Sequence, residues 1–238
     1  MPPRYEVIGI VGLPEIRKGD DLGRLIVEAA ASQGTALRDG DLLVVSQKIV
    51  SKSEGRVVRL ADVTPSPAAL AMARELAKDA RLVELILRES RRVVRMDKGI
   101  LIVETHHGWI CANGGVDQSN VDLDAASLLP EDPDRSARTL RERIRGLTGV
   151  DAAVIISDTF GRPWREGLTN VAIGIAGLTP IKNYLGAQDP AGHTLQATLL
   201  AVADELAGAA EPVMGKLNRV PATIIRGLPF SERIKIHI

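Results

Sequence analysis

The spacing of apolar residues along the chain switches several times between a pattern typical of strands and one typical of helices. Short apolar runs bounded by Gly, Pro or Asp predict strands. They lie at residues 5–11, 42–46, 150–157, 171–176 and 222–225. The fourth run contains Gly174 and is followed by Gly177, so we expect a bulge or a close backbone approach there.

Apolar residues three or four positions apart predict helices between these strands. The clearest begins at Leu22, after Asp20 and Asp21, because acidic residues suit a helix N-terminus. Further helical runs cover residues 67–95, 137–147 and 194–210, and the second of these is expected to start within residues 132–136. Two more strands, 99–104 and 109–112, flank a hairpin-length loop. The elements alternate without the rhythm of a barrel or a doubly wound sheet, which predicts a mixed α/β (α+β) fold.

Composition narrows the classes of function. The 238 residues are 45% hydrophobic and 25% charged, and 30 basic residues balance 30 acidic ones, so no overall field attracts nucleic acid or membrane. Aromatic residues make up only 3%, which leaves few platforms for base stacking. We therefore expect no nucleic-acid or membrane partner.

We expect no signal for export. Its start has no apolar run typical of a secretion signal, and no stretch of about 18 apolar residues occurs. Cys111 is the only cysteine, which rules out an intrachain disulfide and a cysteine zinc site and indicates a small buried residue. A cytoplasmic protein is expected, built as one unit over residues 1–238, either undivided or in two subdomains.

Asp158 is the sharpest single candidate for chemistry. It follows an apolar strand that we expect to stop there, and Thr159 adds a hydroxyl. Ligands are often held at such strand ends, and oxygen donors suit Mg²⁺ or Mn²⁺. Arg162 and Arg165 could neutralise phosphate oxygens or a carboxylate. The alternative for this segment is an aspartate that caps a turn.

Asp117 lies in the glycine-supported segment Asn113-Gly-Gly-Val-Asp-Gln-Ser-Asn120. Glycines let the backbone approach a ligand, and the polar side chains supply oxygens and amides. Taken alone, the segment is more often a turn than a site. Spacing does not establish that Asp117 meets Asp158.

Ser46, Lys48 and Lys52 share one side if their segment stays extended, and their hydroxyl and ammonium groups could hold a polyphosphate. Equally, this segment could be the exposed end of a strand, where lysines prevent the sheet edge from pairing with another chain. Neither a P-loop nor a Rossmann glycine motif occurs. His106 and His107 are adjacent and diverge in any regular element, so a loop role is favoured over metal binding.

Five segments, in order through nearly the whole chain, resemble the coenzyme F420:glutamate ligases, also called F420-0:gamma-glutamyl ligases. They are Gly12-Leu-Pro-Glu15 with Gly19-Asp-Asp-Leu22, then Asp39 to Ser46 with Ile49 to Arg56, then Gly114 to Val121, then Ser157-Asp-Thr-Phe-Gly-Arg162, and finally Ala172 to Gly177. Such an ordered set is far more specific than any one segment.

This resemblance implies a family-specific fold in an intertwined homodimer, and a GTP-dependent ligase that adds L-glutamate to F420-0. The first amide would form at the lactyl carboxylate through an acyl phosphate, followed by γ-linked additions. It implies Mg²⁺ or Mn²⁺, one or two per subunit, with GTP as co-substrate and K⁺ as a further candidate cofactor. Metal would be held by Asp117, Asp158 and Thr159. The residues expected to line the GTP site are Leu13, Pro14, Glu15, Ile16, Ser46, Lys52, Asn120, Gly215 and Lys216.

Two departures from the family pattern matter. Residues 212–219 form a short segment without a carboxylate, where some members carry acidic residues for a second metal, so Lys216 is the expected phosphate contact. We expect no flavin-dependent reductase-like domain of the kind that fused members carry, and no general base is assigned. The rivals are a same-family ligase for another small carboxylate, a GTP-binding regulator without turnover, and a metal hydrolase using Asp117 and Asp158.

Overall fold

A mixed five-stranded sheet forms the centre of the molecule. We describe residues 2–228 of a computed structural model. The sheet has the order β1-β12-β2-β8-β9, in which β2 and β8 run parallel and the other neighbours are antiparallel. The strands are β1 (Glu6–Gly9), β12 (Ala222–Arg226), β2 (Leu42–Ser46), β8 (Ala153–Gly161) and β9 (Leu168–Ala176). The mixed α/β class expected from the sequence is confirmed.

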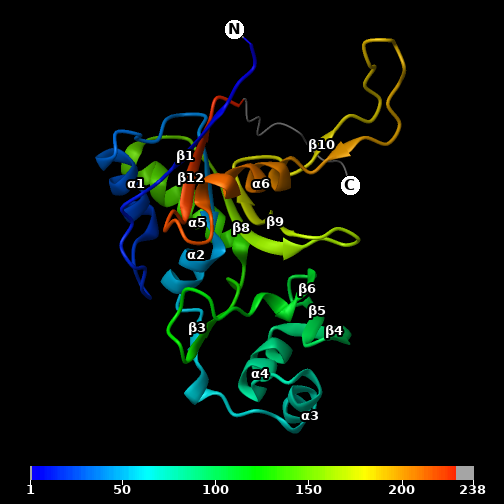
Figure 1. Cartoon of the computed structure of the whole chain (residues 1–238). Helices are drawn as coiled ribbons and strands as arrows, with labels where there is room; N and C mark the ends of the chain where they lie inside the picture. The colour runs from blue at the N-terminus through cyan, green and yellow to red at the C-terminus, as the bar shows by residue number, and fades with distance from the viewer. Residues whose placement is uncertain (1, 229–238) are drawn as a thin grey trace.

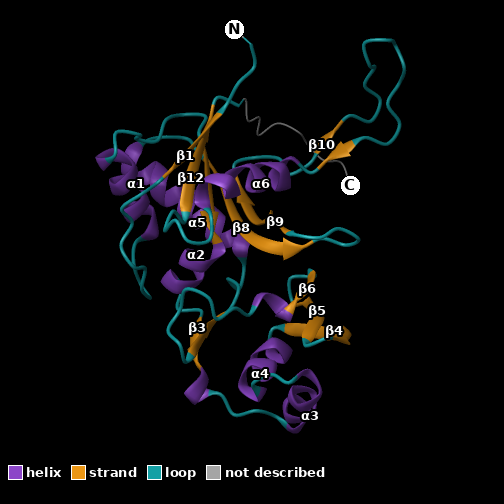
Figure 2. Cartoon of the chain, in the orientation of Figure 1, coloured by secondary structure: helices purple, strands orange, loops and turns teal. Residues whose placement is uncertain are grey.

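Helices cover both faces of this sheet (Figure 2). On one face, α1 (Leu22–Ser32) and α5 (Pro133–Thr148) enclose a core that includes Ile26, Ile144 and Ile156. On the other face, α6 (Val202–Met214) packs its alanines and Leu206 against Ile155 and Ile225. Burying both faces explains why β2 and the first half of β8 are continuous apolar runs.

The helix starts follow from capping residues in the sequence. The Asp21 side chain accepts a hydrogen bond from the Arg24 backbone N–H, and the Asp132 side chain accepts one from the Arg135 N–H. Each satisfies a backbone donor that the first helical turn leaves free. The helix predicted from Leu22 is confirmed, and so is the helix start predicted within residues 132–136, because α5 begins at Pro133.

A smaller part lies beneath the sheet (Figure 1). It contains α3 (Pro67–Leu76), α4 (Ala80–Arg88) and the antiparallel sheet β4 (Ser90–Asp97), β5 (Ile100–Thr105) and β6 (Ile110–Ala112). The prediction of one helix over residues 67–95 is therefore wrong. Ala77 adopts a left-handed conformation at φ 51° and Asp79 caps a new helix, so the chain turns between α3 and α4.

The smaller part leaves and rejoins the central part at one place. There β3 (Val57–Arg59) pairs antiparallel with β7 (Ala125–Ser127), and Val57 faces Ser127. The 3₁₀ turns η1 (Leu60–Asp62) and η2 (Asn113–Gly115) lie within the enclosed segment. The predicted strands at 99–104 and 109–112 are confirmed as β5 and β6.

The segment after β2 is a helix, not the extended strand exit assumed from the sequence. Helix α2 spans Gln47–Ser53, and the Ser46 side chain accepts a hydrogen bond from the Lys48 N–H at its start. Lys48 and Lys52 still share a side, because residues four apart lie on one face of a helix. The expectation about their common direction thus holds for a different reason.

The strand prediction was also wrong at Asp158. Strand β8 continues to Gly161, whereas its parallel partner β2 ends at Ser46, opposite Ser157. Asp158 is therefore the first residue of β8 without β2 beside it. The predicted irregularity at Gly174 is confirmed, because the β8–β9 register shifts there and a Cβ on Gly174 would lie 2.3 Å from the Pro133 carbonyl oxygen.

Residues 194–201 are not helical, contrary to the prediction. They belong to an arm that projects from the body and carries the two-stranded ribbon β10 (Lys182–Asn183) and β11 (Leu199–Leu200) (Figure 1). Helix α6 starts at Val202 and ends at Met214, and Gly215 at φ 55° turns the chain toward β12.

Candidate functional site

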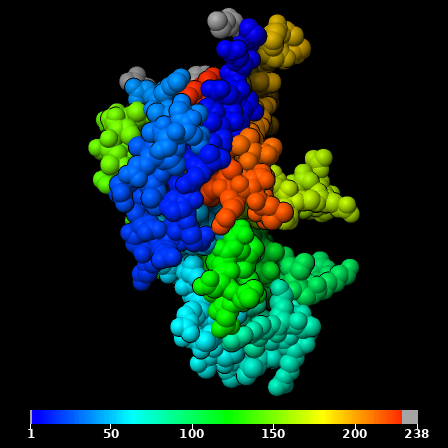
Figure 3. Space-filling view, turned by 60° about the vertical axis from the view of Figure 1, so that its left-hand side comes forward, coloured from blue at the N-terminus to red at the C-terminus, as the bar shows by residue number. Residues whose placement is uncertain are grey.

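A cleft of about 1090 Å³ opens where β2 ends, between the central sheet, the end of α6 and the loop that precedes β7. In the space-filling view, the orange segment after α6 lies directly above the green segment that carries this loop (Figure 3). All the residues predicted to hold metal or GTP line this one cleft. They are Leu13, Pro14, Glu15, Ile16, Ser46, Lys52, Asn120, Gly215, Lys216, Asp117, Asp158 and Thr159.

Asp117 is held in place by a compact set of donors. Lys48 Nζ lies 2.6 Å from Asp117 Oδ2 and also donates to the Ser119 carbonyl at 2.8 Å. The Ser119 N–H and hydroxyl both donate to the Asp117 carboxylate. Burial raises the pKa of Asp117, but the bonds from Lys48 and Ser119 outweigh it, so the pKa lies below its ordinary value.

Asp158 occupies a very different environment. Burial raises its pKa to about 6, and the backbone N–H of Thr159 and the charge of Lys48 offset only part of this rise. The negative charge of Asp117 raises the pKa of Asp158 further. Asp158 makes no ion pair among the described residues. A bound cation would stabilise the charged form of Asp158, because it would offset both the cost of burying that charge and the repulsion from Asp117.

The side chain of Thr159 points away from that of Asp158, because successive strand residues face opposite sides of a sheet. Its hydroxyl donates to Asn170 Oδ1 at 2.8 Å, and Asn170 Nδ2 donates to Glu211 Oε2 at 2.8 Å. Thr159 thus begins a hydrogen-bonded row that crosses from β8 through β9 to α6.

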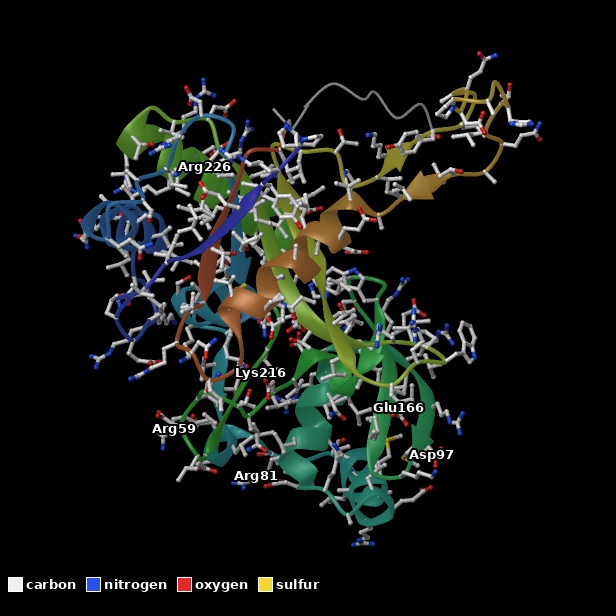
Figure 4. All side chains as sticks on the ribbon, turned by 45° about the horizontal axis from the view of Figure 1, so that its top comes forward. Arg59, Arg81, Asp97, Glu166, Lys216 and Arg226 are labelled. Atoms are coloured by element: carbon white, nitrogen blue, oxygen red, sulfur yellow. The ribbon has the colours of Figure 1, made fainter. Side chains whose placement is uncertain are left out.

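The candidate GTP residues form the opposite wall. Lys52 pairs with Glu15, which ties α2 to the loop of residues 11–20. Lys216 lies below the end of α6, between the central and smaller parts, and is exposed (Figure 4). Asn120 adopts φ 56°, a conformation that Asn tolerates better than most residues. Lys48, Lys52 and Lys216 therefore line one cleft, together with Lys18.

Sequence reasoning missed several cleft residues. Lys48 was considered as a phosphate contact but not as a partner of Asp117. Asn170 and Glu211 also line the cleft, although Asn170 lies just before the predicted strand 171–176 and Glu211 just after the predicted helical run 194–210. No local motif marks them, since their proximity depends on how α6 packs on β9. Arg162 and Arg165 lie in the β8–β9 hairpin, and neither lines the cleft.

The residues present fit a hard divalent cation in part. Asp117 and Asp158 are the cleft carboxylates that influence one another electrostatically. Within residues 2–228, no group of three or more His, Cys, Asp or Glu side chains is placed to hold a metal ion. Two carboxylates suit Mg²⁺ or Mn²⁺ when substrate phosphates and water supply the other oxygens.

The remaining candidates behave as structural residues. His107 stacks on Trp109 with ring centroids 4.6 Å apart. His106, in the β5–β6 loop, makes a hydrogen bond with the backbone carbonyl of Arg88 at the end of α4. Cys111 is buried, and burial raises the pKa of its thiol to about 11. In the part of the chain that the structure describes, no helix is long and apolar enough to cross a membrane.

The fold and cleft define a mixed α/β protein with a polar cleft lined by carboxylates and lysines, in a chain whose sequence has no P-loop motif. Residues 10–227 match the model of the F420-0:Gamma-glutamyl ligase family. The chain therefore belongs to that family and is a ligase.

Several curated relatives carry the name coenzyme F420:L-glutamate ligase. The protein of Methanothermobacter thermautotrophicus is 48% identical over 227 residues, which cover 95% of this chain and 90% of the relative. The Methanopyrus kandleri protein is 47% identical over 223 residues, or 93% and 86%. The Methanocaldococcus jannaschii protein is 39% identical over 234 residues, or 96% and 91%.

Proposed function

We propose that this protein joins L-glutamate to coenzyme F420-0 in a reaction driven by GTP and dependent on Mg²⁺ or Mn²⁺. The observation that supports it most strongly is the convergence on one cleft of residues from widely separated segments of the sequence. Carboxylates Asp117 and Asp158 lie on the same cleft as Lys48, Lys52 and Lys216, a combination suited to metal-bound phosphates.

The proposed chemistry proceeds through an acyl phosphate. A free carboxylate is a poor acyl donor, so the γ-phosphoryl group of GTP is first transferred to the lactyl carboxylate of F420-0. The amine of L-glutamate then attacks the acyl phosphate, and phosphate leaves. Further γ-linked glutamates are added in the same way. Such transfers depend mainly on positioning and on compensation of negative charge.

The chain's own residues supply much of that compensation. Lys52 and Lys216 bind phosphate oxygens, and Lys48 holds Asp117 and Ser119 in position. Asp117 and Asp158 would hold the divalent cation, which supplies positive charge against the phosphates when bound. Thr159, the third residue proposed to hold the metal, lies on the same cleft next to Asp158 in the sequence. Residues 212–219 contain no carboxylate that could hold a second metal. Lys216 therefore supplies part of the positive charge that a second metal would bring.

A homodimer is part of this proposal. The arm of residues 177–201 exposes Ile181, Leu185 and Leu199, and a two-stranded ribbon has little stability by itself. Packing on a second copy would bury these side chains. Analytical ultracentrifugation of the wild type and of Leu199→Glu tests this, and a monomeric wild type would refute it. K⁺ dependence and a cytoplasmic location stay predictions.

The deciding experiment combines F420-0, L-glutamate, GTP and Mn²⁺ or Mg²⁺ with the purified protein and follows products by mass spectrometry. Products heavier by glutamyl residues support the proposal. GTP hydrolysis without an acceptor indicates a hydrolase instead, and binding without turnover indicates a regulator. Ligation to another small carboxylate, with F420-0 inert, keeps the class of reaction and changes the substrate.

A further inference from the structure

Glu211 is a cleft carboxylate for which the proposed reaction has so far no role. It lies in the last turn of α6 and is half-buried. Asn170 Nδ2 donates to its Oε2 at 2.8 Å, and Thr159 in turn holds Asn170 through a 2.8 Å hydrogen bond to Oδ1. The carboxylate is thus fixed in direction by a neutral amide rather than by a cation.

The other cleft carboxylates have different settings. Glu15 pairs with Lys52, and Asp117 pairs with Lys48. Asp158 lies at the centre of the predicted metal site, and Asp122 is exposed at the cleft surface. Among residues 2–228, Glu211 makes no ion pair although it is partly withdrawn from water. A charge held in this way is available to a cationic group of a ligand.

Ligation brings such a group into the cleft, because the amino acid that attacks the acyl phosphate arrives as an ammonium ion. We propose that Glu211 binds the α-ammonium of the incoming glutamate and accepts a proton from it. This rests on the function proposed above. The row Glu211–Asn170–Thr159 ends at one of the predicted metal ligands, and all three residues line the cleft that contains Asp158, so Glu211 would bind the amine in the same cleft as the proposed metal site.

The proton and bond balance is complete with these groups. One proton passes from the ammonium to the Glu211 carboxylate, which frees the nitrogen lone pair. The nitrogen attacks the acyl carbon, the bond from that carbon to the phosphate oxygen breaks, and phosphate leaves. The second proton lost by nitrogen goes to the leaving phosphate. Glu211 then releases its proton to solvent, and no further reactant is needed.

Glu211→Gln tests the proposal, because glutamine keeps an oxygen that can accept from Asn170 but removes the charge. We expect glutamate-dependent ligation to fall by about 100-fold or more, with a raised KM for glutamate. The second measurement replaces glutamate with hydroxylamine, a weakly basic amine that is mostly unprotonated at neutral pH. Hydroxamate formation by Glu211→Gln should match the wild type, since this nucleophile needs no base.

Glu205→Gln provides the matched control, because Glu205 is exposed on the same helix and does not line the cleft. It should ligate glutamate like the wild type. Normal glutamate ligation by Glu211→Gln would overturn the proposal, and so would an equal loss with glutamate and hydroxylamine, which would indicate a structural role. If the wild type forms no hydroxamate, the acyl-phosphate route fails, and the KM for glutamate still decides whether Glu211 binds the ammonium.

Discussion

Lys48 Nζ and Asp117 Oδ2 are 2.6 Å apart, although the two residues are 69 positions apart in the chain. The pair joins α2, at the edge of the central sheet, to the loop that returns from the smaller part. The Lys48 side chain is only 14% exposed and that of Asp117 is 43% exposed, so the bond is shielded from solvent on the lysine side alone. One ion pair therefore fixes the relative position of two walls of the cleft.

Lys48→Met should destabilise the metal-free protein by up to about 1 kcal/mol, because it removes the cation that pairs with Asp117, and the 43% exposure of the Asp117 side chain lets water screen the pair. Added Mn²⁺ should stabilise this variant more than the wild type, since the metal replaces the lost charge. Urea denaturation with EDTA or Mn²⁺ measures both effects. Lys98→Met, at an exposed turn, is the control and should leave both values unchanged.

Lys52→Ala should weaken GTP binding by about 10- to 100-fold, which corresponds to the loss of one charge-assisted contact of roughly 1.5–3 kcal/mol. Calorimetric titration with GTP and Mg²⁺ measures it. Glu15→Gln separates this role from the ion pair that Lys52 makes with Glu15. If both variants lose affinity equally, the pair acts by holding the loop, and the direct phosphate contact is wrong.

Asp158→Asn should abolish turnover and yet stabilise the metal-free protein at neutral pH. Folding raises the pKa of Asp158 from 3.8 to about 6, so between these values the folded state binds more protons than the unfolded state. The contribution of Asp158 to the free energy of unfolding therefore falls as the pH rises through this window, by up to about 3 kcal/mol.

Urea denaturation in EDTA at pH 4 and pH 7.5 checks this sign. The stability of Asp158→Asn relative to the wild type should increase toward the higher pH. Mn²⁺ should then stabilise the wild type at pH 7.5 but not the variant. If Asp158→Asn keeps full activity under limiting metal, Asp158 is not a metal ligand.

Gly174→Ala should lower the free energy of unfolding by at least about 2 kcal/mol, because overpacking a rigid contact forces the backbone to move. The added Cβ would lie 2.3 Å from the Pro133 carbonyl oxygen. Gly146→Ala is the matched control, since no atom lies within 4 Å of its Cβ position, and α5 should gain about 0.5–1 kcal/mol. Thermal unfolding of both variants distinguishes them.

The sequence predicts the elements whose signals are local. Asp21 and Asp132 cap helices whose starts could be placed within a few residues, and the apolar run of β2 needed no tertiary information. Gly174 was informative because close packing and a bulge both demand a small residue. The resemblance to the family placed Asp117 and Asp158 in one site, which spacing alone did not.

The errors arise where tertiary packing outweighs local pattern. The run after Arg88 has helix-forming residues, but it pairs with β5 and becomes a strand. Asp158 looked like a strand end because apolar residues stop there, whereas β8 continues beside β9 alone. Glu211 gave no signal, since only the packing of α6 against β9 brings it to Asn170.

The pairing of Val57 with Ser127 gives the protein a modular character. Residues 60–124 depart from the central part and return to it through neighbouring strands, as an inserted cassette does. This cassette carries Asp117 and Asn120, whereas Lys52, Asp158 and Glu211 stay on the central part. A chimera that takes the cassette from a relative would therefore exchange one wall of the cleft as a block and leave the facing wall native.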